Sequence, residues 1–203
     1  WILYLEQKPH EKGRTTLKIK RFGSANETSQ ELTPSPINVR TRIHGYGGGA
    51  FSVISNENDL WVIWINDLDG CLYFQVWSGL LTVDHHQDIL LEAKNHPLQL
   101  TQPSKNYFAD GLIDLKRSRW VGIMDDNKKD CIISLSLLKE KQNPKILYRA
   151  LDFLGYPSLS PKADQLVWIE WKHPSMPWDS SQLYFSEINQ AGDLIKPFQI
   201  AGS

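Results

Sequence analysis

The side chains best suited to chemistry are concentrated in residues 39–51, which read VRTRIHGYGGGAF. Arg40, Arg42 and His44 alternate along this segment, so an extended strand would place all three on one face. That face could line a channel and bind a carboxylate, with Tyr46 beside it. It could equally form hydrogen bonds and ion pairs with carbonyl and carboxylate groups between packed sheets, and we favour this second interpretation. These four residues are therefore the candidate substrate-binding or channel-facing residues.

Residues Gly47, Gly48 and Gly49 allow another backbone or a ligand to approach closely. A phosphate-binding loop is not indicated, because the segment has no Gly-Lys-Ser/Thr sequel, no G-x-G-x-x-G spacing and no following helix pattern. Two interpretations stay open, namely direct contact with a ligand and a crowded inner strand. We favour the crowded strand.

The sequence predicts no catalytic residue, no metal site and no cofactor. It contains no G-x-S-x-G nucleophile motif, and its six histidines lack the spacing of metal ligands. His85 and His86 lie in the polar connection 82–88 and are interpreted as solvated loop residues. Asp125 and Asp126 precede Asn127, which predicts an exposed hairpin turn and not a carboxylate dyad.

A second unusual segment, residues 171–179, reads WKHPSMPWD. Its two prolines stiffen the chain, and a tryptophan is costly to leave in water. We expect this segment either to fold back on its own sheet or to contact a partner. His173, Met176 and Trp178 are the candidate interface residues.

Composition sets the class of protein that must position these side chains. The 203 residues include 22 Lys and Arg against 23 Asp and Glu, and this balance argues against a dedicated nucleic-acid binder. The longest apolar run, residues 60–65, is too short to span a membrane. Cys71 and Cys131 are expected to be buried, reduced thiols, which favours a cytoplasmic protein. Trp1 already lies in an apparent strand, so we expect a piece of a larger protein.

Short strands rich in β-branched and aromatic residues recur along the chain. Similar strands begin at residues 1, 61, 120 and 166, and each is followed by a polar turn and two further strands. Repeats of this length, with large apolar residues on both faces of the middle strands, are typical of β-propeller blades that stack on one another.

The sequence therefore predicts an all-β fold, a partial β-propeller of about three to four four-stranded antiparallel blades. The expected divisions are the end of a first blade (1–34) and then blades at 37–102, 105–149 and 152–203. A β-sandwich is the competing fold. Because closed propellers have about four to eight blades, this chain alone is not expected to close a ring.

Three segments resemble bacterial peptidases of the prolyl oligopeptidase family, in particular the acylaminoacyl-peptidase and dipeptidyl-aminopeptidase related group. They are residues 40–51, residues 108–114 (FADGLID) and residues 173–179 (HPSMPWD). The resemblance implies an N-terminal propeller that covers a C-terminal α/β-hydrolase domain with a Ser-Asp-His triad. This chain would supply only part of the propeller and no triad residue. Gly45 stands where the family motif has Glu, which removes one potential partner for a substrate amine or an arginine.

The resemblance implies a cytoplasmic serine peptidase whose propeller gates and positions short peptides for a hydrolase domain absent from this chain. The fragment alone is predicted to be inactive. Its expected partners are a peptide substrate, the hydrolase domain and further copies that pair with open blade edges, but neither nucleic acid nor a membrane. The alternatives are a scaffold for protein–protein interaction, similar to WD-repeat or TolB-like propellers, and a truncated or degenerate enzyme.

Overall fold

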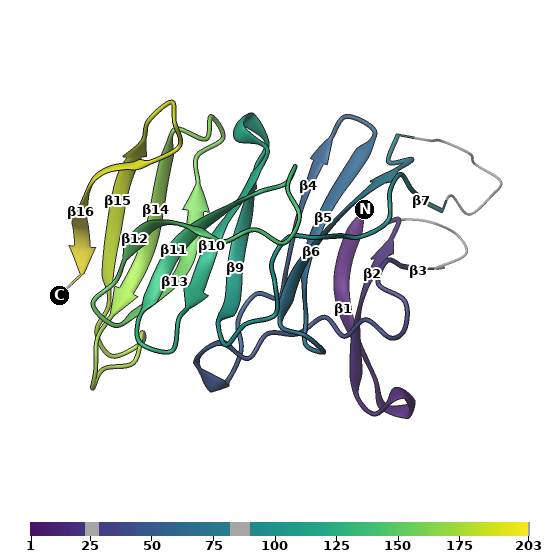
Figure 1. Cartoon of the computed structure of the whole chain (residues 1–203), viewed down its shortest axis with the longest axis horizontal. Helices are drawn as coiled ribbons and strands as arrows, with labels where there is room; N and C mark the ends of the chain where they lie inside the picture. Colours follow the sequence, from purple (N-terminus) through teal and green to yellow (C-terminus); the bar gives the residue numbers. More distant parts are fainter. Residues whose placement is uncertain (23–28, 82–89, 203) are drawn as a thin grey trace.

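The computed structural model describes residues 1–22, 29–81 and 90–202, and the regular secondary structure of these residues is almost all β-strand (Figure 1). Apart from the strands, the described residues form three single turns of 3-10 helix: η1 (Pro9–Glu11), η2 (Ile43–Gly45) and η3 (Leu115–Arg117). Within these ranges no helix has the length and hydrophobicity needed to cross a membrane. The prediction of an all-β chain is confirmed.

The strands form four antiparallel sheets that follow one another along the chain. The first sheet contains β1 (Ile2–Lys8), β2 (Arg14–Lys20) and β3 (Ser29–Glu31). The second contains β4 (Phe51–Asn56), β5 (Asp59–Asn66) and β6 (Cys71–Ser78), with the short strands β7 (Glu92–Ala93) and β8 (Leu98–Gln99) both pairing with β6. The third contains β9 (Tyr107–Asp114), β10 (Arg119–Asp125), β11 (Asp130–Ser136) and β12 (Lys145–Arg149). The fourth contains β13 (Phe153–Leu159), β14 (Gln165–Trp171), β15 (Gln182–Ile188) and β16 (Leu194–Gly202).

The sheets stack side by side in chain order, which is the arrangement of a partial β-propeller and not of a sandwich (Figure 1). The first strands of the last three sheets are neighbours, since β4 contacts β9 and β9 contacts β13. In the predicted repeat, β1 corresponds to the second strands β5, β10 and β14. Among the described residues the first sheet therefore has no counterpart of β4, β9 and β13.

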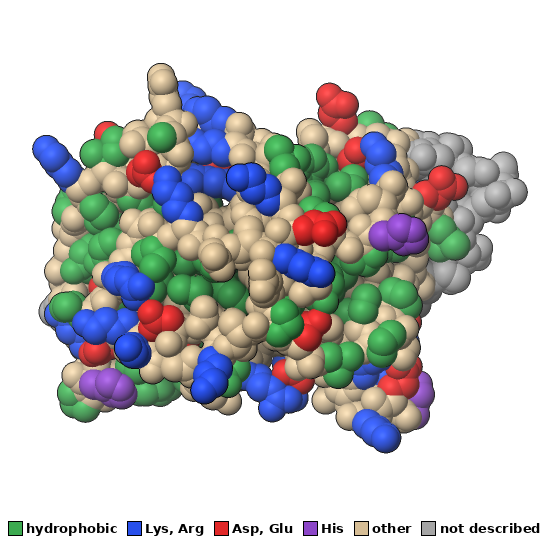
Figure 2. Space-filling view, viewed as in Figure 1, with side chains coloured by type: hydrophobic (Ala, Val, Ile, Leu, Met, Phe, Trp, Pro, Cys, Tyr) green, Lys and Arg blue, Asp and Glu red, His purple; other side chains and the backbone are tan. Residues whose placement is uncertain are grey.

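The middle strands of the second and third sheets, which have a sheet on either side, bury side chains on both faces, as stacking requires. In β5, Val62 and Trp64 pack toward the first sheet, whereas Ile63 and Ile65 pack toward the third. The two cysteines are also buried and free, as predicted. On the face seen in Figure 2, acidic and basic side chains are interspersed with hydrophobic ones, in keeping with the balanced composition.

One end of the stack carries η2 and the turns β5–β6, β10–β11 and β14–β15. This end, the lower edge in Figure 1, is called the η2 end. The strands β4, β9 and β13 all begin here, because each pairs antiparallel with a strand that finishes here. The candidate residues of both unusual segments therefore lie at the same end of the sheets.

Candidate functional site

Residues 40–49 do not form the extended strand that their alternation predicted. Residues 43–45 form the η2 turn, in which His44 has φ 55° and Gly45 has φ 79°. Both values are in the left-handed region, which reverses the chain and destroys the period of two. The expectation that Arg40, Arg42 and His44 share one face is therefore wrong.

Arg42 pairs with a carboxylate of the second sheet. Its Nε and Nη2 atoms donate to Asp67 at 2.6 and 2.8 Å, in a bidentate geometry. The hydrogen bond from Arg42 lowers the pKa of Asp67 below its ordinary value. Arg40 lies beside the same carboxylate, and both arginines line a cavity of about 240 Å³ together with Tyr107. Arg42 is thus held by a bidentate ion pair although its side chain is 61% exposed, and Arg40 is also exposed.

His44 pairs with a different sheet. Its Nε2 atom lies 2.7 Å from Oδ2 of Asp130, and the backbone N–H of Leu154 donates to the same oxygen at 2.7 Å. The side chains of His44 and Asp130 are 9% and 2% exposed. Because His44 belongs to η2, Asp130 to β11 and Leu154 to β13, one buried carboxylate connects three successive parts of the propeller.

Tyr46 lies on the outer side of this pair. When Nε2 of a neutral His44 donates to Asp130, Nδ1 becomes an acceptor, and the hydroxyl of Tyr46 lies 3.5 Å from it. Burial, together with nearby Tyr156, Asp130 and Asp110, raises the pKa of Tyr46 above its usual value. The residue is nevertheless 66% exposed and can present its ring to a ligand.

Aromatic rings surround His44 and extend toward the second unusual segment. The centroid of the His44 ring lies 5.4 Å from that of Phe153 and 5.8 Å from that of Trp171. Phe153 in turn contacts His173, with ring centroids 4.8 Å apart. The structure therefore brings His44, Tyr46 and His173 into one cluster, while Arg40 and Arg42 lie apart from it, near Asp67.

The loop 172–181 is held by its own hydrogen bonds. Met176 N–H donates to the Asp179 side chain at 3.0 Å, and Asp179 N–H donates back to the Met176 carbonyl at 2.9 Å. Met176 is half-buried, but Trp178 is 76% exposed. The expectation that Trp178 folds back onto its own sheet is therefore wrong. The other expectation, contact with a partner, stays a prediction.

The glycines of the segment face β9. A Cβ atom at Gly49 would lie 2.8 Å from Oδ1 of Asp110, and one at Gly48 would lie 3.0 Å from Cβ of Ala109. Gly49 N–H donates to that Asp110 oxygen at 2.6 Å. This is the close packing against an inner strand that the favoured interpretation expected.

Sequence reasoning did not single out Asp130, Asp152 or Phe153. With His44 and His173 they line a cavity of about 320 Å³ at the η2 end. They come from separate parts of the chain and meet only because the third and fourth sheets stack, so no local spacing could have found them. The hairpin prediction for Asp125 and Asp126 is confirmed, since the turn lies between β10 and β11.

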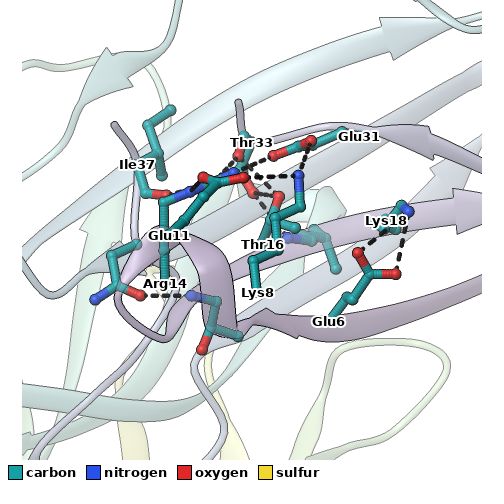
Figure 3. Close-up of polar contacts among 12 residues, drawn as sticks. Glu6, Lys8, Glu11, Arg14, Thr16, Lys18, Glu31, Thr33 and Ile37 are labelled. Carbon is teal, nitrogen blue, oxygen red and sulfur yellow. Dashed lines mark hydrogen bonds and ion pairs between the residues drawn. The ribbon is translucent and has the colours of Figure 1, made fainter. Parts of the chain in front are cut away.

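A dense charge cluster in the first sheet has a structural role (Figure 3). Arg14 donates to Glu11 and Glu31, each at 2.6 Å, and to the carbonyls of Thr33 and Ile37. Burial alone would raise the pKa of Glu31, but hydrogen bonds from Lys8, Arg14 and Thr16 outweigh it and lower that pKa to about 2. The cluster ties β1–β3 to the segment leading into the second sheet.

The described residues contain no group of three or more His, Cys, Asp or Glu side chains placed to bind a metal ion. His85 and His86 lie outside the described residues.

Comparison with known proteins finds no family model and no curated protein that matches this chain. Solved structures do match. A puromycin-hydrolyzing peptidase of Mycobacterium tuberculosis aligns at TM-score 0.78 and 23% identity, over 99% of this chain and 30% of that one. Puromycin hydrolase, also solved as a mutant complexed with PGG, aligns at TM-score 0.80 and 21% identity, over 99% of this chain and 31% of that one. The chain thus has the fold of a segment spanning about a third of these peptidases.

Proposed function

We propose that this chain is a propeller segment of a serine peptidase of the prolyl oligopeptidase family that cleaves short peptides. The observation that carries the proposal is the fold match over 99% of the chain to peptidases about three times its length. The segment would gate and position substrate, and bond cleavage would take place in a C-terminal α/β-hydrolase domain. Nothing in the described surface favours the scaffold alternative over this role.

The outer face of the fourth sheet supports a larger propeller. Val121 and Ile123 of β10 are buried beneath this sheet, at 1% and 0% exposure. Their counterparts in the repeat, Val167 and Ile169 of β14, point to the opposite side and are only half-buried. The face is thus equipped to receive a further sheet.

That apolar face continues across the neighbouring strands. Phe185 pairs with Val167 on one side and with Phe198 on the other, and the two phenyl rings contact each other. Phe198 is 54% exposed. Exposed apolar rows of this kind mark interaction surfaces. We therefore interpret this face as one that another sheet covers in the larger propeller. In its absence, copies of this chain would associate through the same face or through open strand edges.

Each candidate site residue takes a role within this proposal. Arg40 and Tyr46 are the exposed groups that would contact peptide, and Arg42 and His44 would hold the segment that carries them. The loop with His173, Met176 and Trp178 would contact a partner domain. The ranges 1–34, 37–102, 105–149 and 152–203 are the proposed blade boundaries, and the two buried thiols agree with a cytoplasmic location.

The proposal is tested with the complete polypeptide encoded by the gene. We expect a G-x-S-x-G motif after the propeller and hydrolysis of short chromogenic peptides, with a sharp loss of activity toward long or folded substrates. Purified residues 1–203 serve as the control and are expected to give no turnover. A reading frame without a hydrolase domain, or turnover by residues 1–203 alone, would contradict the proposal.

A further inference from the structure

The cavity of about 320 Å³ at the η2 end is lined by charges of both signs. Asp125 and Asp152 contribute carboxylates, and Lys128 and Lys129 contribute ammonium groups. Among the described residues, none of these four side chains takes part in an ion pair. Its volume is at the lower end of the range of small-molecule sites, about 300–1,000 Å³.

Local hydrogen bonds fix the two carboxylates without neutralising them. Asp125 accepts the N–H of Asn127 at 2.7 Å, and Asp152 accepts the N–H of His173 at 3.1 Å. A backbone amide contributes a dipole but no charge. Each carboxylate therefore has a further oxygen available for an incoming cation.

The lysines stand on a hairpin tip that is itself anchored. Asp126 accepts the N–H groups of Lys128 and Lys129 at 3.1 and 3.0 Å, and it pairs with Arg149 at 2.8 Å. Because Arg149 already neutralises Asp126, the two lysine side chains are not needed there. They can bind an anion held in the cavity.

Part of the cavity lining is aromatic. Phe153 and His173 meet edge to face, and the hydrogen-bonded pair of Asp130 and His44 also lines the cavity, with the His44 ring against Phe153. An ammonium group placed over an aromatic face gains a cation–π attraction in addition to its ion pair. Apolar rings next to charges of both signs suit a small molecule with two charged ends.

We propose that this cavity binds a free amino acid or dipeptide in its zwitterionic form. The α-ammonium would contact Asp152 and Asp125 over the Phe153 ring, and the α-carboxylate would contact Lys128 and Lys129. The choice of ligand class rests on the proposed peptidase function, but binding itself requires only this chain. The cavity would then bind both charged ends of a short peptide at once. In a longer peptide the two ends would lie too far apart to contact the aspartates and the lysines together.

The test is calorimetric titration of residues 1–203 with dialanine, N-acetyl-dialanine and dialanine amide. We expect dialanine to bind, and each capped form to bind about tenfold more weakly or worse, since each loses one charge-assisted contact. Asp152→Asn should weaken dialanine binding and reduce discrimination against the acetylated form, with Asp125 keeping the remainder. Lys129→Gln should likewise reduce discrimination against the amide, with Lys128 keeping the remainder. Glu140→Gln and Lys139→Gln, in the exposed turn at the opposite end, are the matched controls.

Undetectable binding of dialanine at millimolar concentration would overturn the inference. So would equal binding of the capped forms, or cavity variants that behave like the two controls. These outcomes are separable from failure of the proposed function. A complete enzyme that cleaves peptides while residues 1–203 bind no dialanine refutes the cavity alone, whereas specific binding without any hydrolase domain in the gene refutes the peptidase proposal alone.

Discussion

Replacing Asp130 with alanine removes the carboxylate that connects η2, β11 and β13. Two groups lose their acceptor: the buried N–H of Leu154 and Nε2 of His44, both 2.7 Å from the same oxygen. An unsatisfied buried N–H costs about 1–3 kcal/mol, and a hydrogen bond to a charged group contributes about 1.5–3 kcal/mol. Since such terms are not fully additive, we expect Asp130→Ala to lower the free energy of unfolding by about 3–5 kcal/mol.

The assay is urea unfolding followed by tryptophan fluorescence, together with a thermal scan. For a chain of this size the expected loss corresponds to a decrease in Tm of about 6–20 °C. Asp130→Asn retains an acceptor oxygen in the same place and should cost less than half as much. Asp125, the cross-strand neighbour of Asp130, is the matched control, because its side chain only accepts a surface N–H.

We expect Asp125→Ala to change stability by less than about 1 kcal/mol. The reasoning would be refuted if Asp130→Ala stayed within about 1 kcal/mol of the wild type. It would also be refuted if the two alanine variants were equally destabilised, since the cost would then come from the hairpin and not from the three-way junction.

Three further predictions concern the sheets. Gly111→Ala should destabilise the protein by about 3 kcal/mol or more by overpacking, because the new Cβ would lie 1.9 Å from the Trp120 ring. Gly45→Ala meets no atom within 4 Å and should cost only the strain of its left-handed φ, about 1–2 kcal/mol; urea unfolding compares the two variants. Stability should decline as pH falls from about 4.5 toward 2 while Glu31 gains its proton, and Glu31→Gln should flatten this decline in acid titration. Phe198→Lys should reduce self-association in sedimentation velocity without lowering Tm, and unchanged association would contradict an adhesive outer face.

The repeat of strands was predictable from sequence because each blade uses the same local pattern. A β-strand alternates its side chains between two faces. Where both faces are buried, as in β5, the strand is a continuous apolar run such as residues 60–65, and this run is recognisable in the sequence. The hairpin at Asp125 and Asp126 was predictable for the same reason, since turn residues act locally. These features depend on near neighbours in the chain.

The candidate site was predictable only in part. The sequence pointed to segment 39–51 as the candidate site but predicted its geometry wrongly, because η2 depends on left-handed conformations at His44 and Gly45. Histidine at φ 55° is uncommon, and here its ring is held from outside the segment by Asp130. Contacts between sheets decide such a conformation, and local periodicity carries no information about them.

The η2 turn determines which side chains of residues 39–51 have a carboxylate partner. An extended strand would have presented Arg42 and His44 together, as one cationic surface. The turn instead directs Arg42 to Asp67 in the second sheet and His44 to Asp130 in the third. Both side chains already have a carboxylate partner, although Arg42 stays 61% exposed, whereas the exposed Arg40 and Tyr46 make no such ion pair among the described residues. In sequence this segment resembles a binding site. In the structure, two of its four candidate residues, Arg42 and His44, instead hold the segment against neighbouring parts of the propeller.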